Sequence, residues 1–353
     1  GNEYQAIAFY FLFGLTVCVT EIPRIIYLLE ITPAEYRGAW SISVSYFVTY
    51  GRVVTLALDQ HLADSQFNST AIKSLSIVYL FGVALLLLVV EESPRYLIKE
   101  GRIDELKQVL QSIQRFSLLF RKQQVLEIAD VDLLALHGKF SKQSGALLFK
   151  SNVRAILNRK YLAKFVVTIL CFIAVFLVFV GQMIVFPYRY SQPRTLYHGR
   201  ILVFYLVELI SITINVFLVD KYSVGRLFLL KVYSLLCVPV FAVGFFNTGP
   251  TLDFSLFLLS RVLVKGWIIL MQPYSLELFP SNLRIVVAAV QYIILNLVQV
   301  PFNYLFLELS QYHARYIHLT FLCLSLGGLL TVMLLPDDKR NFSLDYRNSL
   351  SNY

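Results

Sequence analysis

The stretch EESPRYLIKEGR, residues 91–102, marks a change in the character of the chain. An apolar segment over residues 72–91 ends at its first residue, and a basic, amphipathic stretch follows it. An apolar window of about 20 residues is long enough to cross a bilayer as a helix. Residues 91–102 are therefore interpreted as the point where the chain leaves a membrane and enters the cytoplasm.

The composition is that of an integral membrane protein. Of the 353 residues, 57% are hydrophobic and only 15% are charged, and the mean hydropathy is +0.65. A soluble protein is about one-quarter charged, and no water-soluble packing would bury this much apolar surface. The formal net charge of +9 is concentrated between the apolar segments, where membrane topology explains it, so nucleic acid is not an expected partner.

Nine apolar windows are long enough to span a bilayer. Because backbone groups in lipid must bond within their own segment, each window is predicted to be an α-helix. The predicted spans are residues 5–29, 39–58, 72–91, 161–187, 199–220, 227–247, 252–275, 285–306 and 314–335. The four cysteines fall inside these windows and are interpreted as small buried residues, so we expect no disulfide, metal site or cofactor.

The basic residues predict which side of the membrane each loop occupies. One set of loops, together with the C-terminal tail, carries 20 Lys and Arg residues, 13 of them within residues 92–160, and the opposite loops carry five. Basic loops face the cytoplasm. The N-terminus is therefore expected outside and the C-terminus in the cytoplasm, in either the plasma membrane or an organelle.

Four motifs carry a family resemblance. The pattern E-S-P-R-Y-L-I-x-x-G-R within residues 91–102 resembles the signature that follows the sixth membrane helix in sugar and organic-ion transporters of the major facilitator superfamily. The three further motifs are Glu30-x-x-Pro33-x-x-x-Arg37-Gly38, Asp220-Lys221…Gly225-Arg226 and Glu277-Leu278-Phe279-Pro280-Ser281-x-x-Arg284. Together the motifs most resemble the organic cation and organic anion transporter family.

The resemblance implies a fold and a division of the chain. It implies an all-α integral membrane protein with the major facilitator fold, in which the nine predicted helices are helices four to twelve and the first three are lacking. The expected parts are a partial N-terminal bundle (1–91), a cytoplasmic amphipathic linker (92–160), a six-helix C-terminal bundle (161–335) and a cytoplasmic tail (336–353). Apolar residues at helical spacing predict two linker helices, over 102–116 and 122–136.

Charged residues inside the predicted spans are candidates for a substrate site, because each costs about 2.5–3.5 kcal/mol in a membrane helix and usually faces a cavity or a partner. Glu208 and Arg261 lie at equal depth in their helices, so an ion pair is expected between them. Lys265 lies one turn deeper on the face of Arg261. Arg52 is a further intramembrane cation in need of a partner. The alternative is a purely structural ion pair, with Lys265 extending to the membrane surface or hidden between helices.

The resemblance implies further site residues. Glu208 and Arg261 stand where organic-ion transporters carry an acidic residue in the eighth helix and a basic residue in the tenth. Asn296 occupies a position that is acidic in organic-cation transporters and basic in organic-anion transporters, and Gln182 matches a region that lines the cavity. For Asn296 the alternative is an interhelical hydrogen bond. The aromatic candidates are Tyr50 and Tyr292, for which simple packing is the alternative.

The four motifs also imply a gate. In the family, the loop that contains Asp220 and Arg226 pairs charges across the cytoplasmic ends of the two bundles when the transporter faces outward. A salt bridge at the water interface can break and re-form during a transport cycle. The alternative is positive-inside topology with ordinary helix ends. The predicted gating residues are Glu30, Arg37, Glu91, Arg95, Asp220, Arg226, Glu277 and Arg284.

The predicted function is secondary active or facilitated transport of a small organic ion or polar solute by alternating access. The chain is not expected to be an enzyme, since it has no G-x-x-x-x-G-K-[ST] motif and no nucleophile–base pattern. A small excess of positive charge inside the membrane favours an organic anion or a zwitterion. The residues counted are Arg24, Arg52, Arg261 and Lys265 against Glu21 and Glu208, an excess of two. The alternative is a transport-inactive membrane subunit or scaffold, with a membrane-protein partner, if the first three helices are absent.

Overall fold

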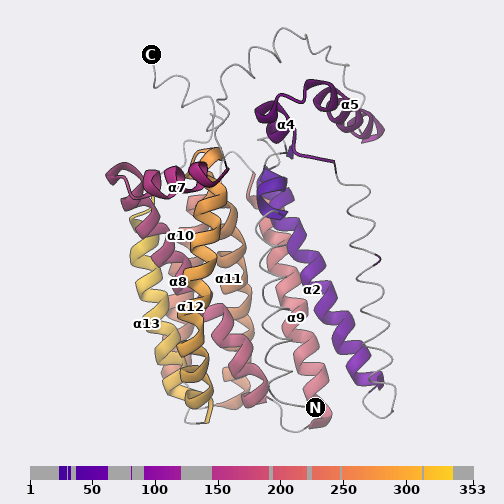
Figure 1. Cartoon of the computed structure of the whole chain (residues 1–353). Coiled ribbons are helices and arrows are strands. Elements are labelled where there is room, and N and C mark those ends of the chain that lie inside the picture. Colours follow the sequence, from indigo (N-terminus) through magenta and orange to yellow (C-terminus); the bar gives the residue numbers. More distant parts are fainter. Residues whose placement is uncertain are drawn as a thin grey trace, which may run out of the picture. The chain divides into compact units, whose positions relative to one another are not determined.

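A computed structural model describes residues 24–29, 31–32, 37–62, 81, 91–120, 145–190, 194–220, 225–246, 249–311 and 314–336. Every regular element within these ranges is a helix, as predicted (Figure 1). The chain divides into two compact units, one of residues 61–150 and one of residues 1–60 together with 151–353. Each unit has an apolar core of its own.

Ten helices carry labels in Figure 1. They are α2 (Arg37–Leu62), α4 (Pro94–Glu100), α5 (Ile103–Phe120), α7 (Gly145–Ile156), α8 (Arg159–Tyr190), α9 (Arg194–Leu218), α10 (Arg226–Phe246), α11 (Pro250–Glu277), α12 (Ser281–Gln311) and α13 (Ala314–Met333). Residues 24–29 form a further helical segment.

Six of the described helices are long and apolar enough to cross a membrane, and they coincide with the six windows predicted between residues 161 and 335. They are Tyr161–Tyr190, Tyr197–Leu218, Arg226–Phe246, Pro250–Glu277, Leu283–Gln311 and Arg315–Met333. Helix α2 covers the predicted span 39–58 but is not among the six, because serine, threonine, tyrosine and Arg52 interrupt its apolar run. The predicted windows 5–29 and 72–91 lie almost entirely outside the described residues.

The core of the larger unit lies where α11 packs against α8, α9 and α10, and where α13 packs against α8 and α10. Cys171 and Cys237 are buried and free, as predicted. The same prediction is wrong for Cys323, because its side chain is exposed on α13. Cys18 lies outside the described residues.

Two adjacent glycines of α13 offer a matched test of this packing. A Cβ atom at Gly328 would overlap the ring of Trp267 on α11, whereas a Cβ atom at Gly327 would meet nothing within 4 Å. We expect Gly328→Val to lower the stability of the protein by about 1–3 kcal/mol, the usual cost of overpacking a core. Gly327→Val is the control, with the same change in helix propensity. Melting in detergent checks the prediction, and equal melting temperatures for the two variants would contradict it.

The signature stretch of the smaller unit folds as a short helix with a defined start and stop. Pro94 takes the first helical position of α4, where its missing N–H costs nothing. Gly101 ends the helix in the left-handed conformation, with φ at 75°. The N–H groups of Gly101 and Arg102 donate to the carbonyls of Ile98 and Leu97 at 3.2 and 3.1 Å, which is the Schellman arrangement. The glycine is therefore needed for this helix end.

Helix α5 has the amphipathic character predicted for residues 102–116. Its Leu106 and Val109 are buried against Leu97 of α4. The second predicted linker helix, over residues 122–136, lies outside the described residues.

Charged side chains connect the ends of α4 and α5. The Arg102 guanidinium contacts Glu105 and donates to Glu92 at 2.7 Å. The hydrogen bonds that Arg102 donates to these two carboxylates, to that of Glu105 first, raise the pKa of its guanidinium. Glu91 is exposed, and its carboxylate accepts a hydrogen bond from the Ser112 hydroxyl at 2.5 Å.

Candidate functional site

The carboxylate of Glu208, on α9, is fully buried and contacts three cations. Its Oε1 accepts a hydrogen bond from Nε of Arg261 at 2.9 Å and contacts Nη2 of the same guanidinium. Its Oε2 lies 3.2 Å from Nζ of Lys265 and 3.2 Å from Nη1 of Arg52. The Thr49 hydroxyl donates to Oε2 at 3.3 Å. The four charged residues Glu208, Arg261, Lys265 and Arg52 are called the Glu208 cluster below.

Helix α8 holds the guanidinium of Arg261 in place. Nη1 donates to the Phe179 carbonyl at 3.0 Å and to Oε1 of Gln182 at 3.3 Å. Nε2 of Gln182 donates to the Ser260 hydroxyl at 2.7 Å, which orients the amide. The rings of Phe179 and Phe204 lie 4.0 and 4.5 Å from the guanidinium carbon, within the range of cation–π attraction. The guanidinium is therefore fixed by groups from α8, α9 and α11.

The Glu208 cluster contains one carboxylate and three cations, so its formal charge is +2. The side chains of Arg261 and Lys265 are 0% and 5% exposed, and that of Arg52 is 31% exposed. Charge removed from water is costly unless it is paired. The cluster therefore holds more positive than negative charge, and Arg52 is its partly exposed member.

The sequence predicts part of this cluster. The ion pair between Glu208 and Arg261 is confirmed. Lys265, on the same helix as Arg261, also contacts the Glu208 carboxylate. Gln182 joins the cluster through Arg261. The contact of Arg52 with Glu208 was not foreseen, because spacing along α2 does not show which helix lies beside it. A role of these residues in substrate binding stays a prediction.

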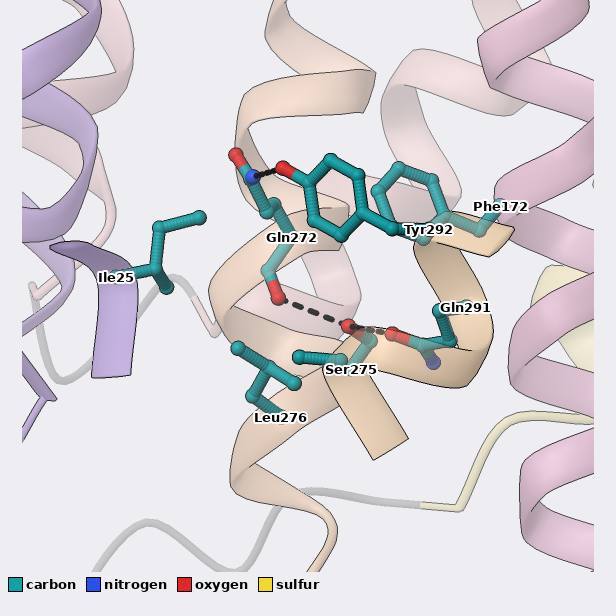
Figure 2. Close-up of a pocket in the computed structure, with 8 residues that line it drawn as sticks. Ile25, Phe172, Gln272, Ser275, Leu276, Gln291 and Tyr292 are labelled. Atoms are coloured by element: carbon teal, nitrogen blue, oxygen red, sulfur yellow. Dashed lines mark hydrogen bonds between the residues drawn. The ribbon is translucent and has the colours of Figure 1, made fainter. Parts of the chain in front are cut away.

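A second polar site is a hollow of about 230 Å³, including the open space at its mouth (Figure 2). Most of that volume is open space, and the enclosed part has room for about one water molecule, far less than a usual ligand pocket. The helical segment 24–29, α8, α11 and α12 contribute to its wall. The lining residues are Ile25, Phe172, Gln272, Ser275, Leu276, Ala288, Gln291 and Tyr292.

The polar groups of this hollow are incompletely paired. Nε2 of Gln272 donates to the Tyr292 hydroxyl at 2.6 Å. Oγ of Ser275 lies 2.8 Å from the Gln272 carbonyl and 3.3 Å from Oε1 of Gln291, as Figure 2 shows. Since the hydroxyl has one proton, it cannot donate to both. Nε2 of Gln291 is buried without a partner among the described residues. The hollow therefore offers amide groups to a hydroxyl or carbonyl of a solute.

Tyr292 is a predicted site residue, whereas Gln272 and Ser275 were not predicted. The signal that could find them is a pair of polar residues three apart in an apolar window, which places both on one helix face.

Two predicted site residues lie apart from both sites. Tyr50 is exposed on α2, and its ring stacks on that of Tyr46 with centroids 6.3 Å apart. Asn296 is exposed on α12, and its Nδ2 donates to the carbonyl of Tyr292 at 2.8 Å, a bond within its own helix rather than the interhelical bond that was the alternative. The predicted substrate contacts of Tyr50 and Asn296 remain untested.

A group of charges joins the start of α2 to α10 and α11. The Arg226 guanidinium contacts the Glu277 carboxylate, and its Nη2 lies 3.4 Å from Oδ1 of Asp220. Oδ2 of Asp220 accepts a hydrogen bond from the backbone N–H of Ala39 at 2.8 Å. A side chain at Gly38 would collide with Asp220 and Arg226, so only glycine allows this approach. Asp220, Arg226 and Glu277 are called the Arg226 latch. Both of its ion pairs lie within the predicted C-terminal bundle, so the predicted charge pairing across the two bundles stays a prediction.

The other predicted gating residues lie outside this group or are not described. Arg284 is buried, and its Nε donates to a backbone carbonyl at 3.1 Å. Arg37 is half-buried at the first position of α2. Glu91 and Arg95 belong to the smaller unit. Glu30 and the side chain of Arg95 lie outside the described residues, and the predicted gate stays a prediction.

Residues 2–340, almost the whole chain, match the family described as sugar (and other) transporters. The chain belongs to this family. Membership confirms the predicted class, a multi-pass integral membrane protein of a transporter family.

The transporter-family chain is also similar to curated proteins over part of its length. It is 35% identical over 107 residues to monosaccharide-sensing protein 1 of Arabidopsis thaliana, covering 29% of this chain and 14% of that protein. It is 29% identical over 116 residues to hexose transporter 1 of Plasmodium falciparum, covering 29% of this chain and 23% of that protein. The names of both relatives refer to sugars and not to organic ions. The narrower resemblance to organic cation and anion transporters therefore stays a prediction.

A solved structure shares the fold. The major facilitator proton:xylose symporter XylE superposes with a TM-score of 0.64 at 17% sequence identity, covering 92% of this chain and 70% of that chain. At this identity the likeness concerns the fold alone. The major facilitator fold predicted from the four motifs is confirmed.

Proposed function

We propose that this protein moves a small polar solute across a membrane by alternating access, and that the Glu208 cluster lies on the path of the solute. The observation that carries the proposal is the surplus of two positive charges in a buried cluster whose Arg52 reaches open space. Ionisable groups within membrane helices are costly, and they usually mark a transport path. Family membership supports transport as the activity.

The surplus charge further supports a solute with a negative charge. A carboxylate next to Arg52 and Lys265 would bring the cluster closer to neutrality. The amide groups of Gln272 and Gln291 suit a single hydroxyl group of a sugar, because the hollow has room for about one water molecule. The solute class that combines both features is a sugar acid, within a wider class of small organic anions. In this proposal the Arg226 latch closes the cytoplasmic side, with the N-terminus outside.

Uptake into vesicles tests the charge preference. Protein reconstituted into liposomes is expected to take up a labelled hexuronate faster than the matching hexose. Removing one charge about 6 Å from the solute is worth about 2–3 kcal/mol at an effective dielectric constant of 20. Lys265→Gln should therefore lower hexuronate uptake at least about tenfold and leave hexose uptake nearly unchanged.

Lys231→Gln is the matched control, because Lys231 lies on α10 outside the Glu208 cluster. Faster uptake of the hexose, unaffected by Lys265→Gln, would reject the anionic assignment and leave a neutral sugar as the solute. Failure of the folded protein to move either solute, or other small organic ions, would favour the alternative, a transport-inactive membrane subunit or scaffold.

A further inference from the structure

The turn between α7 and α8 exposes two arginines on either side of an exposed leucine. Arg154 lies on α7, Leu157 lies in the turn and Arg159 is the first residue of α8. All three side chains are exposed, that of Leu157 at 63%. The N–H groups of Leu157 and Asn158 donate to carbonyls of α7, both at 3.2 Å, which fixes the turn. Arg154, Leu157 and Arg159 are called the α7–α8 elbow below.

The opposite face of this segment is anchored in the protein. Ile156, between the exposed residues, is only 5% exposed. It belongs to an apolar core that also contains Phe165 of α8, Phe279 and Leu283. The Phe165 and Phe279 rings meet edge to face, with centroids 6.4 Å apart. The end of α7 therefore has one face packed on the bundle, and its other face carries an arginine and a leucine outward.

The α7–α8 elbow stands at the head of an exposed apolar stripe on α8. The stripe consists of Leu162, Val166 and Leu170, which are 37%, 42% and 49% exposed within the span that begins at Tyr161. Arg159 comes seven residues before Val166, which at 3.6 residues per turn places the two on the same helix face. An exposed apolar face of a membrane span contacts lipid tails, so the Arg159 guanidinium lies at the level of the lipid headgroups.

This region carries positive charge without any acidic residue of its own. Between Asp132 and Glu208 the sequence has no acidic residue, while residues 150–164 contain five basic ones, Lys150, Arg154, Arg159, Lys160 and Lys164. Within the part of the chain that the structure describes, neither Arg154 nor Arg159 contacts a carboxylate. Arg189 and Arg226, by contrast, both have carboxylate partners. The exposed face is therefore complementary to an anion that the chain itself does not supply.

We propose that the α7–α8 elbow binds the headgroup of an anionic phospholipid, whose tails lie along Leu162, Val166 and Leu170. A free phosphate ester would use the two arginines but not the leucine between them or the stripe below. Segments that combine cations with exposed apolar residues bind at the membrane interface in this way. Each cation close to an anionic membrane surface strengthens binding about fivefold. The site is separate from the proposed solute path and does not depend on transport.

Native mass spectrometry of the purified protein in detergent tests the proposal by counting bound lipid. Phosphatidylserine and phosphatidylcholine with identical tails are the two probes. The first phosphatidylserine is expected to bind at least about tenfold more tightly than the first phosphatidylcholine, because two cations face its extra negative charge. Arg159→Gln should weaken phosphatidylserine binding about fivefold and Arg154→Gln/Arg159→Gln about 25-fold, with phosphatidylcholine binding unchanged.

Lys231→Gln is the matched control, because it removes the same charge from α10, outside the α7–α8 elbow. It should bind phosphatidylserine as the unmodified protein does. Equal affinity for the two lipids, or an equal loss in Lys231→Gln and Arg159→Gln, would overturn the proposal. Displacement of the lipid by soluble glycerophosphoserine at equal concentration would also overturn it, because the site would then recognise a phosphate ester without tails.

Discussion

Replacing Glu208 with glutamine is expected to be among the most damaging single changes in the protein. The substitution keeps the shape of the side chain but leaves the buried cations Arg261 and Lys265 without a counter-charge. Removing one partner of a buried ion pair typically costs about 3–5 kcal/mol. We expect a large drop in melting temperature and in the yield of monodisperse protein in detergent, with uptake lost in vesicles.

Two further variants make this result specific. Glu308→Gln removes a half-buried carboxylate from α12 outside the Glu208 cluster, and it should melt close to the unmodified protein. The double variant Glu208→Gln/Arg261→Gln should be more stable than the sum of its single changes predicts, since it removes both charges of the pair. The assignment of a charge-balancing role to Glu208 fails if Glu208→Gln and Glu308→Gln melt alike.

Neutralising Arg226 is expected to open the contact between α2 and the helices it joins. Arg226→Gln retains hydrogen-bond donors but leaves the carboxylates of Asp220 and Glu277 facing each other without a cation. A hydrogen bond to a charged group contributes about 1.5–3 kcal/mol, so the open population should rise roughly 10–100-fold. Hydrogen exchange at the amide of Ala39 measures this directly, because that N–H donates to Asp220.

Arg154→Gln, which changes an exposed arginine on α7, is the control for Arg226→Gln and should leave Ala39 exchange unchanged. Asp220→Asn should accelerate exchange at Ala39 in the same direction, because a neutral amide accepts more weakly than a carboxylate. Ala39 exchange that is equal in the Arg226 and Arg154 variants would show that the Arg226 latch does not hold the start of α2.

How much of the structure the sequence predicts depends on which structural property each sequence pattern reports. Apolar length alone predicts the helices after residue 160, because a membrane span needs a continuous run that no other element requires. Equal depth predicts the pairing of Glu208 with Arg261, since both helices follow a defined rise per residue. Neither pattern reports rotation about a helix axis. For that reason Asn296 was expected to bind the substrate or to bond across helices, whereas the structure places it on an exposed face and bonds it within its own helix.

The contacts that the sequence does not predict are those between elements remote in the chain. Arg52 and Glu208 are 156 positions apart, and Asp253 and His318 are 65 apart. The sequence does draw attention to His318, because it places an imidazole inside an apolar window. Its partner Asp253 gives no such signal, because acidic residues are common in the first turn of a helix.

Because Glu208 also holds Arg261 and Lys265, Arg52 is the most exposed of its three cations and the one it can lose without becoming unpaired. In the proposed transport of an anion, Arg52 would turn toward the arriving solute while Glu208 stays paired, and the return of Arg52 to Glu208 would take the counter-ion away from the solute. Exchange of partners at one oxygen atom would then allow capture and discharge of cargo with no bare charge at either stage.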